Sequence, residues 1–87
     1  LANCDALYLT VDIDVLDRSF APGTVAALPG GISPAELVAA ISHVVADPRT
    51  VAMDIVEFDP SRDVSDCTAY NVAHAVISAL VALADRS

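Results

Sequence analysis

The sequence contains no lysine and only four arginines, against twelve aspartates and glutamates. The formal net charge is therefore −8 at pH 7, with an isoelectric point near 4.1. A chain of this charge repels nucleic acid and anionic lipid surfaces, so we expect neither class of partner. Cationic partners, including metal ions, are favoured instead.

Paired cysteines, long apolar runs and a basic leader are also missing. Cys4 and Cys67 lie far apart and form no CxxC pair, so we expect no disulfide framework and a reducing, intracellular setting. No uninterrupted apolar run reaches the roughly 18 to 20 residues of a membrane span, which excludes a membrane protein. No signal peptide is visible, so the expected location is the cytoplasm.

Apolar residues are in excess for a chain of this size. They make up 55% of 87 residues, and the mean hydropathy is +0.59. Disorder requires low hydrophobicity, and so short a chain buries only about 60 to 65% of its unfolded surface. We therefore expect a folded chain that is a piece of something larger.

Two segments rich in apolar and β-branched residues, 6–14 and 50–58, predict strands. Their apolar positions are consecutive, as in parallel strands covered by helices on both sides. The connection over 15–32 is irregular and longer than such loops usually are, which indicates a functional loop. Because a helix is predicted between the strands, they should form a right-handed, parallel βαβ unit.

Two helices complete the predicted order. Ser33 as N-cap, Pro34 at the first helical position and Glu36 as the capping-box acid predict the start of the first, which ends near residues 47–48. Its apolar stripe should pack against the sheet and consists of Leu37, Ala40, Ile41, Val44 and Val45. The last helix should begin near residues 65–66 and run to about Ala84. Its expected buried side consists of Val72, Val76, Ile77, Leu80 and Leu83.

Asp12 and Asp14 are the strongest candidates for chemistry. In an extended strand, residues two apart point to the same face, so these carboxylates should project side by side at the carboxyl end of the first strand. A divalent cation such as Mg²⁺, Mn²⁺ or Ca²⁺ would relieve their repulsion. The alternative is that they are solvated loop residues. Asp17 lies beyond the strand and should cap or hold the loop.

Glu57 ends the second strand, where its carboxylate could hold a cationic group through paired, charge-assisted hydrogen bonds. Asp54 lies within an otherwise apolar strand and must be paired, hydrogen-bonded or protonated. We expect it to support the residues of the site without binding the metal or the substrate itself. The remaining polar candidates are given structural roles: packing for His43, His74 and Cys67, turns for Gly30 and Gly31, and contacts to the loop after Asp59 for Thr68, Tyr70 and Asn71.

Four strings together resemble the C-terminal part of the ureohydrolase family, which includes arginase, agmatinase and formimidoylglutamase. They are LTVDIDVLD at 9–17, FAPG at 20–23, GGIS at 30–33 and DIVEFDP at 54–60. The match covers nearly the whole chain in unbroken order. The resemblance implies a βαβα fragment of a three-layer α/β/α fold with a parallel sheet, with residues 1–87 as the C-terminal part of one arginase-like domain whose N-terminal part is absent.

The resemblance also implies the chemistry. Two Mn ions would activate a hydroxide that attacks the carbon of a small, cationic guanidino or amidine substrate. Asp12 would be the carboxylate shared by both metals, Asp14 a ligand of one, and Glu57 the residue that grips the cationic head of the substrate. The family's histidine ligand and proton-shuttling histidine belong to segments outside this chain, so the metal site here is partial. We also expect a homo-oligomer.

Ala26 departs from arginases and agmatinases, which typically have a threonine at this position. Alanine offers a substrate no hydroxyl, so formimidoylglutamate is the first-choice substrate, with agmatine and arginine next. A competing hypothesis is that the fragment is a catalytically silent interaction or structural module. Two parallel strands leave unpaired outer edges in either case, so neighbouring strands should come from further sequence or from another chain.

Overall fold

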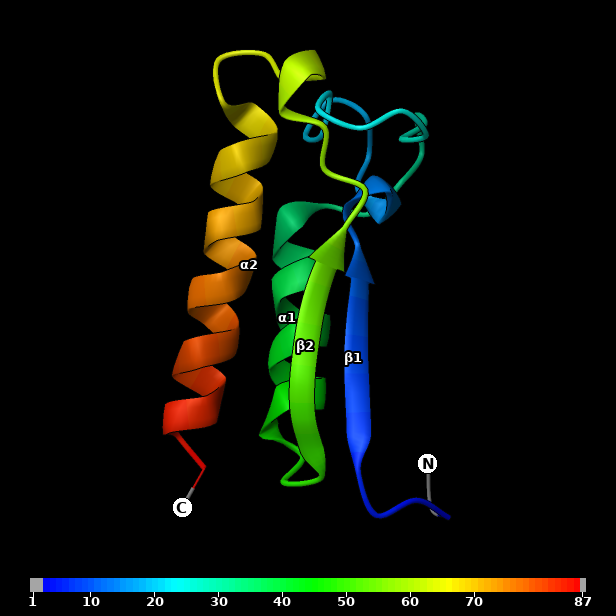
Figure 1. The fold of residues 1–87 in the computed structure, drawn as a ribbon. Helices are drawn as coiled ribbons and strands as arrows, with labels where there is room; N and C mark the ends of the chain where they lie inside the picture. Colours follow the sequence, from blue (N-terminus) through cyan, green and yellow to red (C-terminus); the bar gives the residue numbers. More distant parts are fainter. Residues whose placement is uncertain (1–2, 87) are drawn as a thin grey trace.

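The computed structural model describes residues 3–86, and Figure 1 shows their arrangement. Two strands and two α-helices alternate along the chain, with a short 3₁₀-helix after each strand. In order, the elements are β1 (Leu7–Asp12), η1 (Ile13–Val15), α1 (Pro34–Ala46), β2 (Thr50–Val56), η2 (Pro60–Arg62) and α2 (Cys67–Ala84). The predicted order of strand, helix, strand and helix is confirmed.

The two strands pair in parallel, as predicted. Their register runs from Leu7 opposite Thr50 to Asp12 opposite Val56. Among the residues that the structure describes, each strand has a single neighbour, so its other edge carries unpaired backbone groups. The carboxyl ends of both strands meet at one end of the sheet, where the segments after β1 and β2 gather (Figure 1).

α1 begins where the sequence predicts because two side chains cap it reciprocally. Ser33 Oγ accepts a hydrogen bond from the Glu36 backbone N–H at 3.2 Å, and the Glu36 carboxylate accepts one from the Ser33 N–H at 3.0 Å. Pro34 occupies the first helical position, where no hydrogen-bond donor is needed. The predicted capping box is confirmed.

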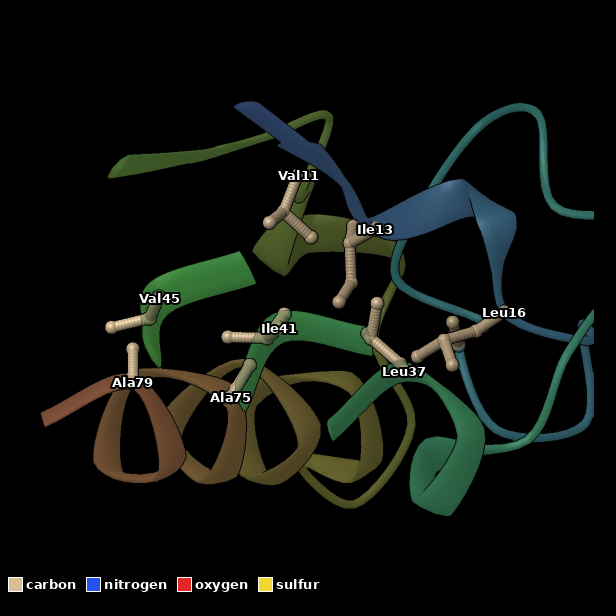
Figure 2. Packing of buried hydrophobic residues seen from close by; sticks show 9 residues of the cluster. Val11, Ile13, Leu16, Leu37, Ile41, Val45, Ala75 and Ala79 are labelled. Carbon is tan, nitrogen blue, oxygen red and sulfur yellow. The ribbon is translucent and has the colours of Figure 1, made fainter. Parts of the chain in front are cut away.

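The core lies between the sheet and the two helices, which are on the same side of the strands (Figure 2). Of the stripe predicted on α1, Val44 is half-buried and Ala40 is exposed. Both residues line a shallow groove between α1 and β1, which nothing in the described part of the chain fills. The residues drawn and labelled in the core are Val11, Ile13, Leu16, Leu37, Ile41, Val45, Ala75 and Ala79.

The buried face of α2 differs from the prediction. Four of the residues expected inside are 40 to 58% exposed: Val76, Ile77, Leu80 and Leu83. The buried positions are instead Thr68, Ala75 and Ala79. Alanines let α2 approach α1 closely, so the helices pack through small side chains while the large ones flank that contact. Val72 packs partly against the core, as predicted.

α2 also departs from the expectation that no segment is long and apolar enough for a membrane span. By length and composition alone the helix qualifies, with a mean hydropathy of 1.6 over 18 residues. The average extends over polar residues such as Asn71, His74 and Ser78, which interrupt the apolar run in the sequence. Core helices of soluble proteins meet the same criterion, so α2 is weak evidence for a membrane span.

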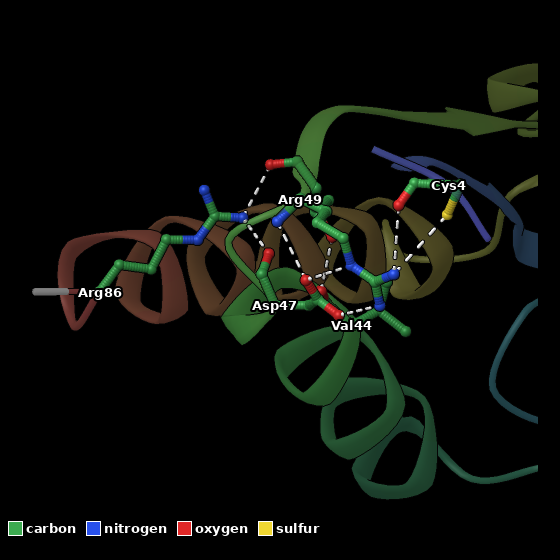
Figure 3. A network of polar contacts seen from close by, with 6 residues as sticks. Cys4, Val44, Asp47, Arg49 and Arg86 are labelled. Atoms are coloured by element: carbon green, nitrogen blue, oxygen red, sulfur yellow. Dashed lines mark hydrogen bonds and ion pairs between the residues drawn. The ribbon is translucent and has the colours of Figure 1, made fainter. Parts of the chain in front are cut away.

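A polar network closes the other end of the sheet (Figure 3). The Arg86 guanidinium donates to three backbone carbonyls, at the end of α1 and the start of β2, at 2.7 to 2.8 Å. Arg49 forms an ion pair with Asp47 at 2.7 Å and donates to the Cys4 carbonyl at 3.4 Å. The network ties the segments before β1 and after α2 to the turn between α1 and β2.

Candidate functional site

Asp12 and Asp14 lie close together, but not as neighbours on one face of a strand. That part of the prediction is wrong, because β1 ends at Asp12 and Asp14 lies in η1. The Asp12 carboxylate accepts a hydrogen bond from the Asp14 backbone N–H at 3.1 Å and so acts as the N-cap of this short helix. An aspartate that binds the backbone two residues ahead favours a turn over a continued strand.

Three acidic residues lie at the carboxyl ends of the two strands: Asp12 ends β1, Asp14 lies in η1, and Glu57 follows β2. The pKa of Asp14 is raised, first by partial burial, then by a side-chain hydrogen bond and charge repulsion from Asp12, and then by the charge of Glu57. Asp14 therefore interacts with both of the other predicted site residues. The parallel register, with Asp12 opposite Val56, sets Asp12, Asp14 and Glu57 at the same end of the sheet.

These carboxylates form a partial donor set for a metal. Carboxylate oxygens are the hard ligands that divalent cations such as Mn²⁺ accept, and a cation would offset the repulsion that raises the pKa of Asp14. Within residues 3–86, no three His, Cys, Asp or Glu side chains are close enough to hold a metal ion together. Asp12 and Asp14 fit as contributors to a site that needs further ligands.

Glu57 has a backbone conformation that the sequence does not reveal. It follows β2 directly and has φ of +72°, in the left-handed region that favours glycine. A non-glycine residue held there costs on the order of 1 to 3 kcal/mol, and such strain is concentrated at functional sites. The sequence signals a strand ending at this point but carries no mark of the left-handed turn.

Asp54 is hydrogen-bonded, as its place in an apolar strand requires. Its carboxylate accepts from the Tyr8 hydroxyl at 2.6 Å and the Thr10 hydroxyl at 2.5 Å, both on β1. The Thr10 and Tyr8 hydrogen bonds lower the pKa of Asp54. These hydrogen bonds join the two strands. The expected role of Asp54 in supporting the metal site stays a prediction.

The long segment 15–32 folds back over the carboxyl end of the sheet and is held by its own polar groups. The Asp17 carboxylate accepts hydrogen bonds from the Ser19 and Gly30 backbone N–H groups at 2.9 and 2.7 Å, which confirms its predicted loop-holding role. Gly30 has φ of +92°, as expected of a turn glycine. Ala26 lies exposed in this segment, while the Thr24 hydroxyl accepts from the Ala27 N–H at 3.0 Å.

The start of α2 binds both loops at this end of the molecule. The Thr68 N–H donates to the Asp63 carboxylate at 2.9 Å, which confirms the predicted contact with the segment after Asp59. Asn71 donates instead to the Phe20 carbonyl at 2.8 Å, in the other loop. Tyr70 is 72% exposed. Contacts from α2 to segment 15–32 could not be read from the sequence, because nothing in it indicates how the loop folds back.

The sequence is similar to members of one protein family. The sequence model described as "Arginase family" matches residues 1–82. The formimidoylglutamase of Bacillus subtilis (strain 168) is 41% identical over 76 residues, which are 87% of this chain and 24% of that protein. The agmatinase of Chromobacterium violaceum is 46% identical over 68 residues, 78% of this chain and 21% of the relative.

The fold is also that of a solved relative. The crystal structure of formimidoylglutamase from Bacillus subtilis superposes with a TM-score of 0.94 at 36% identity, covering 98% of this chain and 27% of that one. The chain thus spans about a quarter of the length of the relatives it matches.

Proposed function

Because the chain belongs to the arginase family, we propose that it is the C-terminal part of an arginase-like domain in a longer, Mn-dependent hydrolase. The reaction is hydrolysis of a non-peptide C–N bond in a linear amidine or guanidino compound. The observation that carries the proposal is the placement of Asp12, Asp14 and Glu57 at the carboxyl end of the parallel sheet. Open α/β folds bind their ligands at this place.

In this proposal, Asp12 and Asp14 hold metal. Asp12 and Asp14 would each serve as a manganese ligand, and the remaining ligands would come from outside these 87 residues. When bound, two manganese ions supply an activated water as the nucleophile. The two carboxylates fix the position of that centre, since one ends β1 and the other lies in the turn that the first one caps.

Glu57 binds the substrate in the same proposal. Its carboxylate would accept paired hydrogen bonds from the cationic, nitrogen-rich head group. Its backbone has φ of +72°, so the chain turns directly after β2. The strand register supports this role, because Asp12 lies opposite Val56 and Glu57 therefore follows β2 at the end of the sheet where Asp12 ends β1.

The exposed apolar surface supports membership of a larger domain. Leu80 on α2 is 58% exposed, and Val51 on β2 is 71% exposed. Both line a groove between β2 and α2, beside the unpaired edge of the sheet. Further strands and helices of a longer protein would cover this surface and pair with the open edges.

Formimidoylglutamate is the first-choice substrate. The Bacillus subtilis formimidoylglutamase matches 87% of this chain, whereas the agmatinase of Chromobacterium violaceum has higher identity over a shorter span of 78%. Ala26 is exposed on the loop and offers no hydroxyl, and the nearby Thr24 is fully buried, with its hydroxyl accepting from the Ala27 N–H. Agmatine is the second candidate, which the 46% identity to an agmatinase favours, and arginine is the third.

The remaining expectations belong to the same proposal. The longer protein acts in the cytoplasm as a homo-oligomer, and it binds neither nucleic acid nor a membrane. The net charge of −8 on these 87 residues supports the exclusion of polyanionic partners.

The direct test is hydrolysis of formimidoylglutamate, agmatine and arginine by the longer protein loaded with Mn²⁺. We expect turnover of one of the three, and a loss of at least about a thousandfold in kcat/KM for Asp12→Asn. Asp66→Asn is the matched control, because Asp66 is an exposed residue whose side chain makes no capping hydrogen bond. No turnover of any substrate, or an Asp12→Asn variant as active as the Asp66→Asn control, would sink the proposal.

A further inference from the structure

A buried threonine at the start of α2 joins the two loops that surround the proposed site. Thr68 is fully buried, and its hydroxyl accepts a hydrogen bond from the Gly23 backbone N–H at 2.7 Å. Gly23 is in segment 15–32, 45 residues away in the sequence. The contact therefore fixes segment 15–32 to the first turn of α2.

The same glycine also binds the segment that follows Glu57. The Gly23 carbonyl accepts a hydrogen bond from the Asp59 backbone N–H at 2.7 Å, two residues after Glu57. Gly23 thus binds Thr68 through its N–H and the segment after Glu57 through its carbonyl. A movement of Gly23 would be transmitted to the short stretch of chain that carries Glu57.

The junction, formed by Gly23, Asp59, Asp63 and Thr68, is closely packed. A Cβ atom added to Gly23 would lie 2.9 Å from Thr68 Oγ1, closer than real Cβ atoms approach, and 3.1 Å from Asp63 Cγ, tighter than most real Cβ contacts. Asp63 binds the other side of the junction, since its carboxylate accepts from the Thr68 and Ala69 N–H groups at 2.9 and 3.0 Å. Close packing and buried hydrogen bonds leave this region with a single arrangement.

From this geometry we infer that Thr68 is a positioning residue for Glu57, acting through the Gly23 peptide. The inference rests on the proposed function, in which Glu57 binds the cationic head of the substrate. Thr68 itself touches neither the metal-binding pair nor the substrate. Its hydroxyl holds Gly23 where the Asp59 N–H can reach the Gly23 carbonyl, and that bond keeps the left-handed turn at Glu57 in place.

The test compares Thr68→Val with Thr68→Ser in the Mn-loaded longer protein. Valine keeps the shape of threonine but leaves the buried Gly23 N–H without an acceptor, whereas serine keeps the hydroxyl. We expect Thr68→Val to raise KM roughly ten- to a hundredfold, since small displacements of a binding group have effects of this size. The kcat and the bound Mn should stay within about twofold of wild type, and Thr68→Ser should restore KM.

A double-mutant cycle separates positioning from general destabilisation. If Thr68 acts through Glu57, adding Thr68→Val to Glu57→Gln should change KM by less than about twofold, because the group being positioned is already impaired. Gly23→Ala, which pushes against the same hydroxyl, should raise KM like Thr68→Val. It replaces that variant if Thr68→Val does not accumulate as folded protein.

The outcomes distinguish this inference from the proposed function. A wild-type protein that hydrolyses none of the three substrates overturns the proposed function. An active wild type whose KM is unchanged by Thr68→Val or Gly23→Ala overturns the positioning role alone. So does a rise in KM of equal size in the wild-type and Glu57→Gln backgrounds.

Discussion

Glu57 combines a strained backbone with a place at the junction of the sheet and its loops. Its φ of +72° is retained although asparagine and glycine adopt that region more readily. The proposed function gives a reason for a glutamate at this strained position, because its carboxylate would bind the substrate. Stability and function should then oppose each other at this residue.

Replacement of Glu57 by asparagine should therefore stabilise the longer protein while impairing substrate binding. We expect the free energy of unfolding to rise by about 0.5 to 1 kcal/mol, because asparagine tolerates the left-handed region better. Urea unfolding measures this change. Glu57→Gln is the matched control, since it removes the charge but not the strain. Equal stability of the two variants would contradict the strain account.

A second prediction at the residue scale concerns pH and Asp47. The Arg49 side chain and backbone hydrogen bonds lower the pKa of Asp47 to about 2, below its usual value of about 3.9. The ionised carboxylate therefore stabilises the folded state above pH 4, and this contribution is lost as the pH falls from about 4 towards 2. Asp47→Asn should be less stable at neutral pH and lose less stability over that range.

Urea midpoints measured at intervals between pH 6 and pH 2 test this prediction. The difference between wild type and Asp47→Asn should be constant above pH 5 and shrink below pH 4. Parallel curves for the two proteins over the whole range would show that Asp47 contributes no such linkage.

At the scale of elements, α1 begins at a boundary that local chemistry determines completely. Ser33→Ala removes the acceptor for the Glu36 N–H and should lower the free energy of unfolding by about 1 kcal/mol. Ser33→Thr keeps a hydroxyl in place and should cost less than half as much. Thermal or urea unfolding of the three proteins provides the comparison, and equal losses for both variants would exclude a capping contribution.

The predictions that were confirmed concern features with local causes, whereas features that depend on residues distant in the sequence were missed. The start of α1 depends on residues within one helical turn, so Ser33 and Glu36 were sufficient to place it. The break between Asp12 and Asp14 also has a local cause, an aspartate that caps the turn after β1, but the strand pattern obscured it. The segment after Glu57 is hydrogen-bonded to Gly23, which in turn binds Thr68, and both residues are distant from Glu57 in the sequence, so no local pattern reveals these contacts.

The buried face of α2 shows the same limit at the level of packing. Large apolar residues were expected inside, yet Ala75 and Ala79 are buried while Ile77 and Leu80 are exposed. Periodicity identifies two apolar faces on such a helix but cannot tell which of them meets α1. The face with the small side chains, Ala75 and Ala79, packs against α1, because it lets the two helices approach closely.

At the scale of the whole molecule, these 87 residues span about a quarter of the length of the relatives they match, and in our proposal they hold only part of the metal site. Two metal-binding carboxylates without their remaining ligands should bind Mn²⁺ weakly, because affinity depends on the number and preorganisation of ligands. We expect the 87-residue chain to bind on the order of a hundredfold or more weakly than the longer protein, as measured by Mn²⁺ titration. Tight, stoichiometric binding by the short chain would contradict the partial site.

The central claim is that Asp12 and Asp14 hold a manganese centre that Glu57 faces without binding. Crystals of the longer protein grown with Mn²⁺, with diffraction recorded at the manganese absorption edge, test it most directly. The account predicts two anomalous peaks, both within coordination distance of Asp12 and one within that distance of Asp14, with Glu57 outside the coordination sphere. Anomalous peaks that lie elsewhere, or none at these carboxylates in a protein that is active with Mn²⁺, would contradict it.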